Sequence, residues 1–242
     1  MLNVLKLIWV HTNGRIGSMS YSFLSNITSL SEGVEFILGK YTYYDRDTLI
    51  DKYSDMPYSF QMIVESMKGI LGTSTIAKII LFDALIGNSD RHHSNWGITE
   101  TKGFLKFDDG IIPANKMRLS PLYDNGSSLC SYINENDIET ILKDKMKYEA
   151  IINTKSKSAI GWNNMRPIRH FELIKNLKEE YFDETIDFVK NIKKNITEQS
   201  IDTILSNFDD TIISNQMKQL LKQFIIDRKN RIIEIYNLES ED

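Results

Sequence analysis

The sequence has 242 residues, 41% of them hydrophobic and 26% charged, which is typical of a globular chain with a sizeable core. Its formal net charge of −4 argues against bulk, nonspecific binding of nucleic acid, which needs a basic surface. The single cysteine, Cys130, excludes an internal disulfide and argues against a cysteine-based zinc site. The apolar start is short and lacks a cationic segment, and no apolar run approaches about 20 residues, so we expect neither a signal peptide nor a membrane span.

The first predicted element is a β-hairpin. Residues 2–10 are rich in β-forming side chains, and Asn13-Gly14 supplies the positive φ angles that a tight turn needs. Residues 16–23 then return as the second strand. The glycines near this turn are too few for a phosphate-binding loop, and Lys6 is better explained as an exposed lysine of an edge strand than as a phosphate-pairing lysine.

The next part of the chain is predicted to be a polar connector followed by two helices. Residues 24–45 are mixed and polar. From Asp47 the pattern turns helical, and Ser54 or Asp55 is the predicted start of a helix that has Pro57 in its first turn and reaches Lys68. Residues 73–85 form the second helix, which is apolar on most sides and ends at a glycine. We therefore expect this helix to be central and to hold the polar loop that follows it.

Two strands are predicted after that loop. Residues 96–99 and 116–119 have the pattern of paired strands, and the insert between them carries turn signals at 101–103 and 108–110. A second polar segment, 120–126, follows the second strand.

The C-terminal part is predicted to be mainly helical. Residues 135–150 have a helical pattern, whereas residues 155–169 are basic and resemble a loop. The remaining predicted helices are about 171–182, 184–195, 198–206 and 214–236. On the last of them, Arg228, Lys229 and Arg231 are most simply explained as the solvated side.

The residues that could carry chemistry gather in the two polar segments. Asp90 and Asn95 lie five positions apart in the loop that leaves the central helix, and Asp124 follows the second strand of the hairpin. If the two strands pair antiparallel, these three oxygen-bearing side chains converge at one end. Oxygen ligands suit Mg²⁺, and phosphoryl transfer needs a carboxylate to orient the attacking hydroxyl and further groups to hold the metal.

Two other interpretations remain open at this point. Both polar segments could be plain turns without a ligand. His92 and His93 could also contribute to a metal site, although adjacent histidines of a strand point apart and rarely bind one ion.

The two segments carry a resemblance to a known family. Asp90-Arg91-His92-His93-Ser94-Asn95 resembles the catalytic loop of the protein-kinase-like superfamily. Ser120-Pro121-Leu122-Tyr123-Asp124-Asn125-Gly126 resembles the metal-binding aspartate segment of HipA-like kinases. Together they identify a similarity to HipA-like serine/threonine kinases, in particular to their Helicobacter branch, from about residue 14 to the C-terminus.

The resemblance implies a role for four side chains. Asp90 would be the catalytic aspartate that accepts or orients the hydroxyl proton. Asn95 and Asp124 would hold Mg²⁺ against the phosphates of ATP. His92 matches the loop histidine of the family, where it braces the catalytic loop.

The fold that the resemblance implies is α+β and mostly helical, the C-lobe of a protein-kinase-like fold with a short N-terminal β-hairpin. We expect residues 1–45 to form the hairpin and connector, as a remnant of the N-lobe and hinge, and residues 46–242 to form the helical C-lobe. The glycine-rich loop and the lysine strand of a kinase N-lobe have no counterpart in this sequence, so the N-lobe is expected to be largely missing.

The function that the resemblance implies is ATP-dependent transfer of phosphate to a serine or threonine of a protein substrate, with Mg²⁺, in the cytoplasm. The chain would be the toxin of a toxin–antitoxin pair or one part of a split kinase. Its expected partners are a protein substrate and either an antitoxin or a polypeptide that supplies the N-lobe, with no membrane and no direct nucleic-acid binding. A catalytically incomplete pseudokinase that acts as an interaction module is the alternative, and a phosphoinositide-type lipid kinase is a weaker one.

Overall fold

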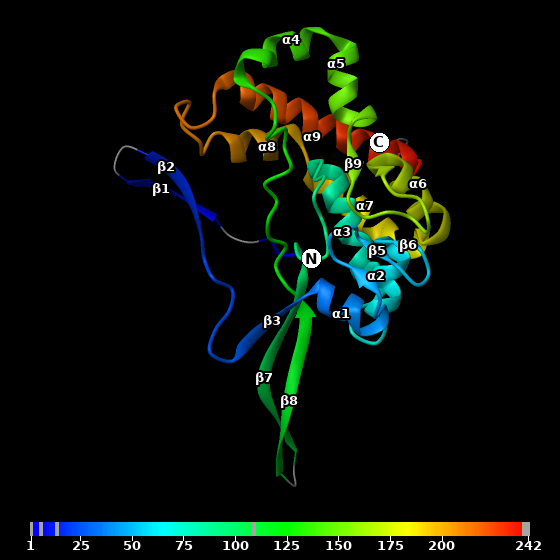
Figure 1. Ribbon diagram of the computed structural model, residues 1–242. Coiled ribbons are helices and arrows are strands. Elements are labelled where there is room, and N and C mark those ends of the chain that lie inside the picture. The colour runs from blue at the N-terminus through cyan, green and yellow to red at the C-terminus, as the bar shows by residue number, and fades with distance from the viewer. Residues whose placement is uncertain (1, 5–6, 13–14, 108–109, 239–242) are drawn as a thin grey trace.

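One buried helix, α3 (Thr73–Ile86), lies at the centre of the chain (Figure 1). The computed structural model describes residues 2–4, 7–12, 15–107 and 110–238. Four helices pack against α3, namely α2 (Phe60–Ser66), α6 (His170–Glu180), α7 (Phe182–Asn195) and α9 (Asn215–Ile235). Because buried residues occur along the whole of α3, it is apolar on several sides, as its sequence pattern predicts.

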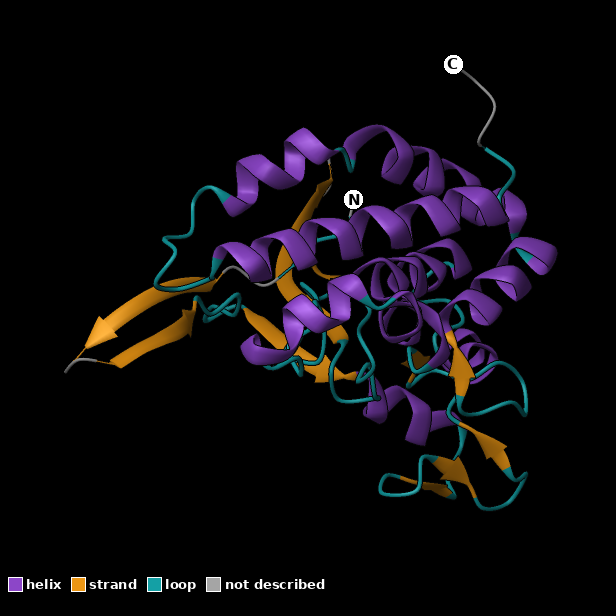
Figure 2. Cartoon of the chain, turned by 90° about the horizontal axis from the view of Figure 1, so that it is seen from above, coloured by secondary structure: helices purple, strands orange, loops and turns teal. Residues whose placement is uncertain are grey.

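The remaining helices are shorter and lie around this core. They are α1 (Gly33–Lys40), α4 (Ile138–Lys143), α5 (Lys145–Glu149) and α8 (Glu198–Leu205), with a 3₁₀ turn at Glu135–Asp137 and a π turn at Ala150–Thr154. Figure 2 shows the helices gathered in one body, with strands mainly at its margins. The helices predicted beyond residue 134 are confirmed to within a few residues at each end, except that the stretch predicted at 135–150 is divided at Asp144 into α4 and α5. None of the described helices is both long and apolar enough to cross a membrane.

Two antiparallel hairpins project from the helical body (Figure 1). The first pairs β1 (Leu7–Thr12) with β2 (Arg15–Ser20), which confirms the predicted N-terminal hairpin. Its turn residues, Asn13 and Gly14, and Lys6 lie outside the described residues.

The second hairpin belongs to a three-stranded sheet. Strand β7 (Gly97–Phe107) is central and pairs with β3 (Thr28–Glu32) and β8 (Gly110–Leu119). The predicted pairing is confirmed, since Ile98 faces Leu119. The turn predicted at residues 101–103 is wrong, because β7 continues through these residues, all of which pair with β8, and Thr101 also pairs with β3.

The helical pattern predicted from Asp47, with a helix start at Ser54 or Asp55, is wrong at its beginning. Residues 44–57 form three short antiparallel strands, β4 (Tyr44–Asp45), β5 (Ile50–Asp51) and β6 (Met56–Pro57). Side chains make the turns between them. Asp45 accepts the backbone N–H groups of Asp47 and Thr48, and Asp51 accepts that of Ser54. Helix α2 starts later, after Ser59, whose side chain caps it.

The connector predicted at residues 24–45 also contains structure, because β3 and α1 lie within it. Neither has a strong local signal. The first N–H groups of α1, on Gly33 and Val34, donate to the backbone oxygens of Trp96 and His93, so distant residues determine where this helix begins. The domain boundary expected after residue 45 stays a prediction.

The position of Arg228 also differs from the prediction. This residue lies on α9, but its side chain is fully buried, whereas a solvated side was expected. Its guanidinium donates to the backbone oxygens of Ala84 and Ile152 and to Oγ of Ser156. The pattern of α9 alone could not distinguish it from Lys229 and Arg231, which are partly exposed.

Gly87 provides a test of how α3 ends. Its φ is 69°, in the left-handed region, and an added Cβ would lie 2.6 Å from the Phe224 ring. We expect Gly87→Ala to lower the free energy of unfolding by about 1–3 kcal/mol, because both the backbone and the packing are strained.

Gly39→Ala is the matched control in urea denaturation. Gly39 lies in α1 and has no atom within 4 Å of an added Cβ. We expect this variant to be as stable as the parent or up to about 1 kcal/mol more stable. Equal losses in the free energy of unfolding of Gly87→Ala and Gly39→Ala would show that Gly87 is not required at the end of α3.

Candidate active site

A buried ion pair between Asp83 and Arg91 lies at the base of the first polar segment. Helix α3 ends at Gly87, and the chain turns back so that Arg91 faces Asp83 on the last turns of the helix. Nη2 of Arg91 lies 2.8 Å from Oδ1 of Asp83, and Nε lies 3.0 Å from Oδ2. The two side chains are 0% and 3% exposed, so each charge depends on the other in place of water.

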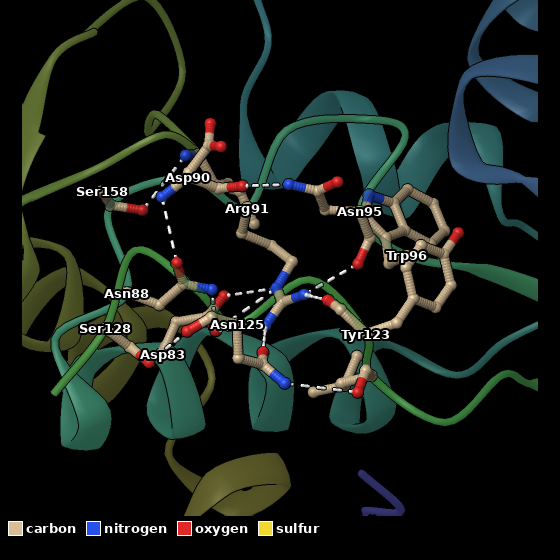
Figure 3. Close-up of polar contacts among 12 residues, drawn as sticks. Asp83, Asn88, Asp90, Arg91, Asn95, Trp96, Tyr123, Asn125, Ser128 and Ser158 are labelled. Carbon is tan, nitrogen blue, oxygen red and sulfur yellow. Dashed lines mark hydrogen bonds and ion pairs between the residues drawn. The ribbon is translucent and has the colours of Figure 1, made fainter. Parts of the chain in front are cut away.

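The same guanidinium joins the two polar segments (Figure 3). Nη1 of Arg91 donates to the backbone oxygen of Asn95 at 2.7 Å and to that of Tyr123 at 2.8 Å. Nη2 also donates to Oδ1 of Asn125. Residues 90–95 and 120–126 therefore meet, as the antiparallel pairing of β7 and β8 requires.

The carboxylate of Asp90 lies on the open side of this junction. Its backbone N–H donates to Oδ1 of Asn88 at 3.1 Å, and its backbone oxygen accepts Nδ2 of Asn95 at 2.6 Å. The backbone of Asp90 is thus held on both sides (Figure 3). Its side chain is 51% exposed and makes no hydrogen bond with another described residue, so the carboxylate is free to accept a proton.

The two histidines of the loop have different surroundings. Nδ1 of His92 accepts the N–H of Ser94 at 3.2 Å, which leaves the ring hydrogen on Nε2, 4.0 Å from Asp90 Oδ1. His93 is buried, and its Nδ1 lies 2.9 Å from the hydroxyl of Tyr44. Burial, with a smaller effect of His92, lowers the pKa of His93 to about 4.

These surroundings argue against the histidine metal site that the sequence left open. The rings of His92 and His93 are inclined at 63° to each other. No group of three or more His, Cys, Asp or Glu side chains suited to a metal occurs within the described part of the chain.

Asn95 and Asp124 retain free oxygens at the junction. Nδ2 of Asn95 is used on Asp90, whereas Oδ1 has no hydrogen-bond partner among the described residues. Asp124 is exposed, has a φ of 51°, and makes no hydrogen bond or ion pair with another residue of the described ranges. An amide oxygen and a carboxylate are the donors that Mg²⁺ prefers, so this donor set fits the metal. The roles assigned to the four site residues stay predictions.

A second buried network supports the loop from below. Nη1 of Arg228 donates to Oγ of Ser156, which lies 3.0 Å from Nδ1 of His170. Nε2 of His170 lies 2.9 Å from the backbone oxygen of Asn88 and donates to it, because a carbonyl can only accept. Burial, followed by the charge of Arg228, lowers the pKa of His170 to about 3, so its ring is neutral.

Sequence reasoning gave no role to Asp83, Asn88 or His170. Asp83 has a signal, since it is an acidic residue within the apolar second half of α3. His170 has none, because its partners are 14 and 82 positions away.

Two cavities differ in their relation to these residues. Asp90 and His92 line a cavity of about 530 Å³. A larger cavity, about 730 Å³, lies between α6 and α9, and none of the predicted site residues lines it. The smaller cavity is therefore the one relevant to the site.

Comparison with known proteins identifies a relative. No family model matches the chain. A stretch of 155 residues, 63% of the chain, is 24% identical to the serine/threonine-protein kinase CtkA of Helicobacter pylori and spans 42% of its length. The fold is similar to the crystal structure of the Helicobacter pylori proinflammatory kinase CtkA, with a TM-score of 0.75 and 17% identity, over 98% of this chain and 76% of the other.

The chain is therefore similar in sequence to CtkA, and its fold is similar to that of the CtkA crystal structure. This confirms the resemblance to the Helicobacter branch and the α+β, mostly helical fold class. The expectation that the N-lobe is largely missing stays a prediction.

Replacement of Arg91 tests the ion pair. We expect Arg91→Met to lower the free energy of unfolding by about 3–5 kcal/mol, because Asp83 is left as an unpaired buried charge. The double variant, Asp83→Asn with Arg91→Met, removes both charges. Its loss in free energy of unfolding should be smaller than the sum of the losses in the two single variants.

Lys40→Met is the control for Arg91 in urea denaturation. It removes the exposed ion pair of Lys40 with Glu65, and it should lower the free energy of unfolding by less than about 1 kcal/mol. Strict additivity of the Asp83 and Arg91 variants would show that the pair is not coupled.

The neutral ring of His170 makes stability depend on pH. An unfolded histidine takes up a proton near pH 6.5, whereas His170 in the folded chain does so only at about pH 3. Between these values the unfolded state binds more protons, so stability is complete above pH 6.5 and falls as the pH is lowered. The slope for one histidine is at most about 1.4 kcal/mol per pH unit. His93 contributes with the same sign down to about pH 4.

His170→Gln isolates this contribution. We expect the variant to be less stable at pH 7 and to lose less stability between pH 6.5 and pH 4 than the parent, as measured by urea denaturation at each pH. Equal slopes in the two proteins would contradict a neutral, buried His170.

Proposed function

We propose that this chain contributes the catalytic loop and metal-binding segment of a serine/threonine protein kinase in the cytoplasm. The reaction is transfer of the γ-phosphoryl group of ATP to a protein hydroxyl. Homology to CtkA supports a kinase-like protein, and the reaction itself is our inference from the site.

The observation that carries this proposal is the link made by Arg91. One guanidinium binds the backbone of Asn95 and that of Tyr123, which precedes Asp124. The residue proposed as catalytic and the two proposed as metal ligands therefore belong to one connected unit. Phosphoryl transfer depends mainly on such positioning and on charge stabilisation.

Asp90 would act on the acceptor. Its free carboxylate accepts a hydrogen bond from the serine or threonine hydroxyl and orients the oxygen toward the γ-phosphorus. As the new oxygen–phosphorus bond forms, the bond to the β–γ bridging oxygen breaks, ADP leaves with that electron pair, and the hydroxyl proton passes to Asp90. His92 braces the loop, because its Nδ1 is held by the Ser94 N–H and its Nε2 faces Asp90.

Asn95 and Asp124 would hold Mg²⁺ through Oδ1 and the carboxylate. When bound, the metal neutralises charge on the nucleotide phosphates. Nδ2 of Asn95 is already bound to the backbone oxygen of Asp90, so the orientation of the amide is fixed and Oδ1 is left to bind the metal.

The rest of a kinase nucleotide site would come from an N-lobe. The sequence offers no glycine-rich loop and no matching lysine strand, so we propose that a separate polypeptide supplies them. A toxin of a toxin–antitoxin pair, divided between neighbouring genes, fits this arrangement. The protein encoded beside this chain is therefore the first partner to test.

Transfer of phosphate from radiolabelled ATP tests the proposal, with the chain alone and with the neighbouring gene product. We expect Asp90→Asn to reduce incorporation by about 10²–10⁴-fold, because an amide cannot take the hydroxyl proton. Asp124→Asn should abolish the thermal stabilisation by Mg²⁺ and ATP.

Asp187→Asn is the matched control, because Asp187 is an exposed carboxylate of α7, outside the residues of the site. It should leave both readouts unchanged. Incorporation that survives Asp90→Asn would defeat the assignment of Asp90. A chain that neither incorporates phosphate nor is stabilised by Mg²⁺ and ATP, with or without its neighbour, would be an interaction module.

A further inference from the structure

The cavity beside Asp90 is unusually basic for a chain with a net charge of −4. Its volume of about 530 Å³ lies within the roughly 300–1,000 Å³ range of ligand pockets. The charged residues of its lining are Arg46, Lys155, Lys157 and Arg166, with Asp47 and Asp90 as the carboxylates. Cations therefore outnumber carboxylates in its lining.

These cations come from two distant parts of the chain. Arg46 lies in the turn between β4 and β5. Lys155 and Lys157 lie at β9 (Lys157–Ser158), and Arg166 precedes β10 (Ile168–Arg169), which pairs with β9. The fold thus brings them together, and nothing in the local sequence requires it.

The four cations are unpaired within the described ranges of the chain. Other cations nearby do have partners, since Lys52 pairs with Asp45 and Arg169 with Glu172. Arg166 uses Nε on the backbone oxygen of Ala159 at 2.9 Å, which holds its side chain while its charge stays uncompensated. A group of like charges without counter-charges is unfavourable by itself and attracts an anion.

The basic side of the cavity is also firmly held. Ser156 lies between the two lysines and is bonded to the buried side chains of Arg228 and His170. The network that supports the catalytic loop therefore also holds the segment that carries Lys155 and Lys157.

We propose that this cavity binds an acidic segment of the protein substrate, with Asp or Glu residues beside the hydroxyl that receives phosphate. The inference rests on the proposed function, because it takes Asp90 as the place of that hydroxyl. Carboxylates a few residues from the acceptor would pair with the lysines and arginines, while the hydroxyl lies at Asp90.

A peptide fits the lining better than a membrane lipid. The lining includes few apolar residues, namely Leu49, Ala159 and Pro167, so a bilayer would find little surface into which to insert. Asp47 would repel the densely charged headgroup of a phosphoinositide more than it repels separated carboxylates.

Binding of labelled peptides, measured by fluorescence anisotropy on the full chain, tests the inference without requiring catalysis. Three peptides share a central serine and differ in flanking residues, which are Glu, Gln or Lys. We expect the Glu peptide to bind at least about tenfold more tightly than the Gln peptide, and this preference should vanish in 1 M salt, where charges are screened within about 3 Å. The Lys peptide should bind least.

Charge removal locates the contact. We expect the affinity for the Glu peptide to fall by about two- to fivefold in each of three variants, as expected for exposed ion pairs. The variants are Lys155→Gln, Lys157→Gln and Arg166→Gln. Lys190→Gln and Lys194→Gln, on the exposed side of α7, are the matched controls and should change nothing. Thermal unfolding of every variant shows that it is folded.

The outcomes separate this inference from the proposed function. Selective binding of the Glu peptide by a parent chain that transfers no phosphate, alone or with its neighbour, supports the basic site and defeats the kinase. Phosphoryl transfer with equal binding of the three peptides overturns the inference and leaves the kinase standing. Two further outcomes overturn it. One is an equal loss of affinity for the Glu peptide in the cavity variants and the controls. The other is tighter binding to vesicles that contain phosphoinositides than to the Glu peptide.

Discussion

The site depends on one buried cation. Arg91 is completely inaccessible to solvent, and a charge in that position is stable only if every side of it is compensated. Asp83 supplies the counter-charge, and the oxygens of Asn95, Tyr123 and Asn125 accept the remaining hydrogens. The planar guanidinium therefore allows one relative position of the helix end, the loop and the segment after β8.

The region around Asp90 is supported by a second buried cation of a different kind. Arg228 has no carboxylate partner among the residues that the structure describes; it is held by carbonyls and lies over the rings of Phe171 and Phe224. Burial lowers its pKa to about 9. Through Ser156 and His170 it connects α9 to the backbone of Asn88, in the loop that holds Asp90, and to the basic segment at residues 155–157. The position of this loop and that of the basic segment therefore depend on the same buried side chains.

The prediction errors at residues 24–57 have a common physical origin. Asp45 and Asp51 use their side chains to form turns that compete with helix, so a helical pattern beginning at Asp47 did not produce a helix. Conversely, α1 forms where the local pattern is weak, because Gly33 lies against Trp96 and its N–H binds the oxygen of that residue. In both places hydrogen bonds that composition does not reveal outweighed the periodic pattern.

The sequence by itself determined the elements with strong local signals. The apolar periodicity of residues 73–85, the glycine that ends it, the strands on either side of the hairpin and the long C-terminal helices all depend on neighbours a few positions apart. It also placed Asp90, Asn95 and Asp124 in the segments that meet. Only the tertiary structure decided that Arg91 joins those segments, that Arg228 is buried, and that Arg46 lies with Lys155, Lys157 and Arg166. Those decisions depend on desolvation and hydrogen bonding between residues up to 144 positions apart, such as Arg228 and Ala84, which no local pattern encodes.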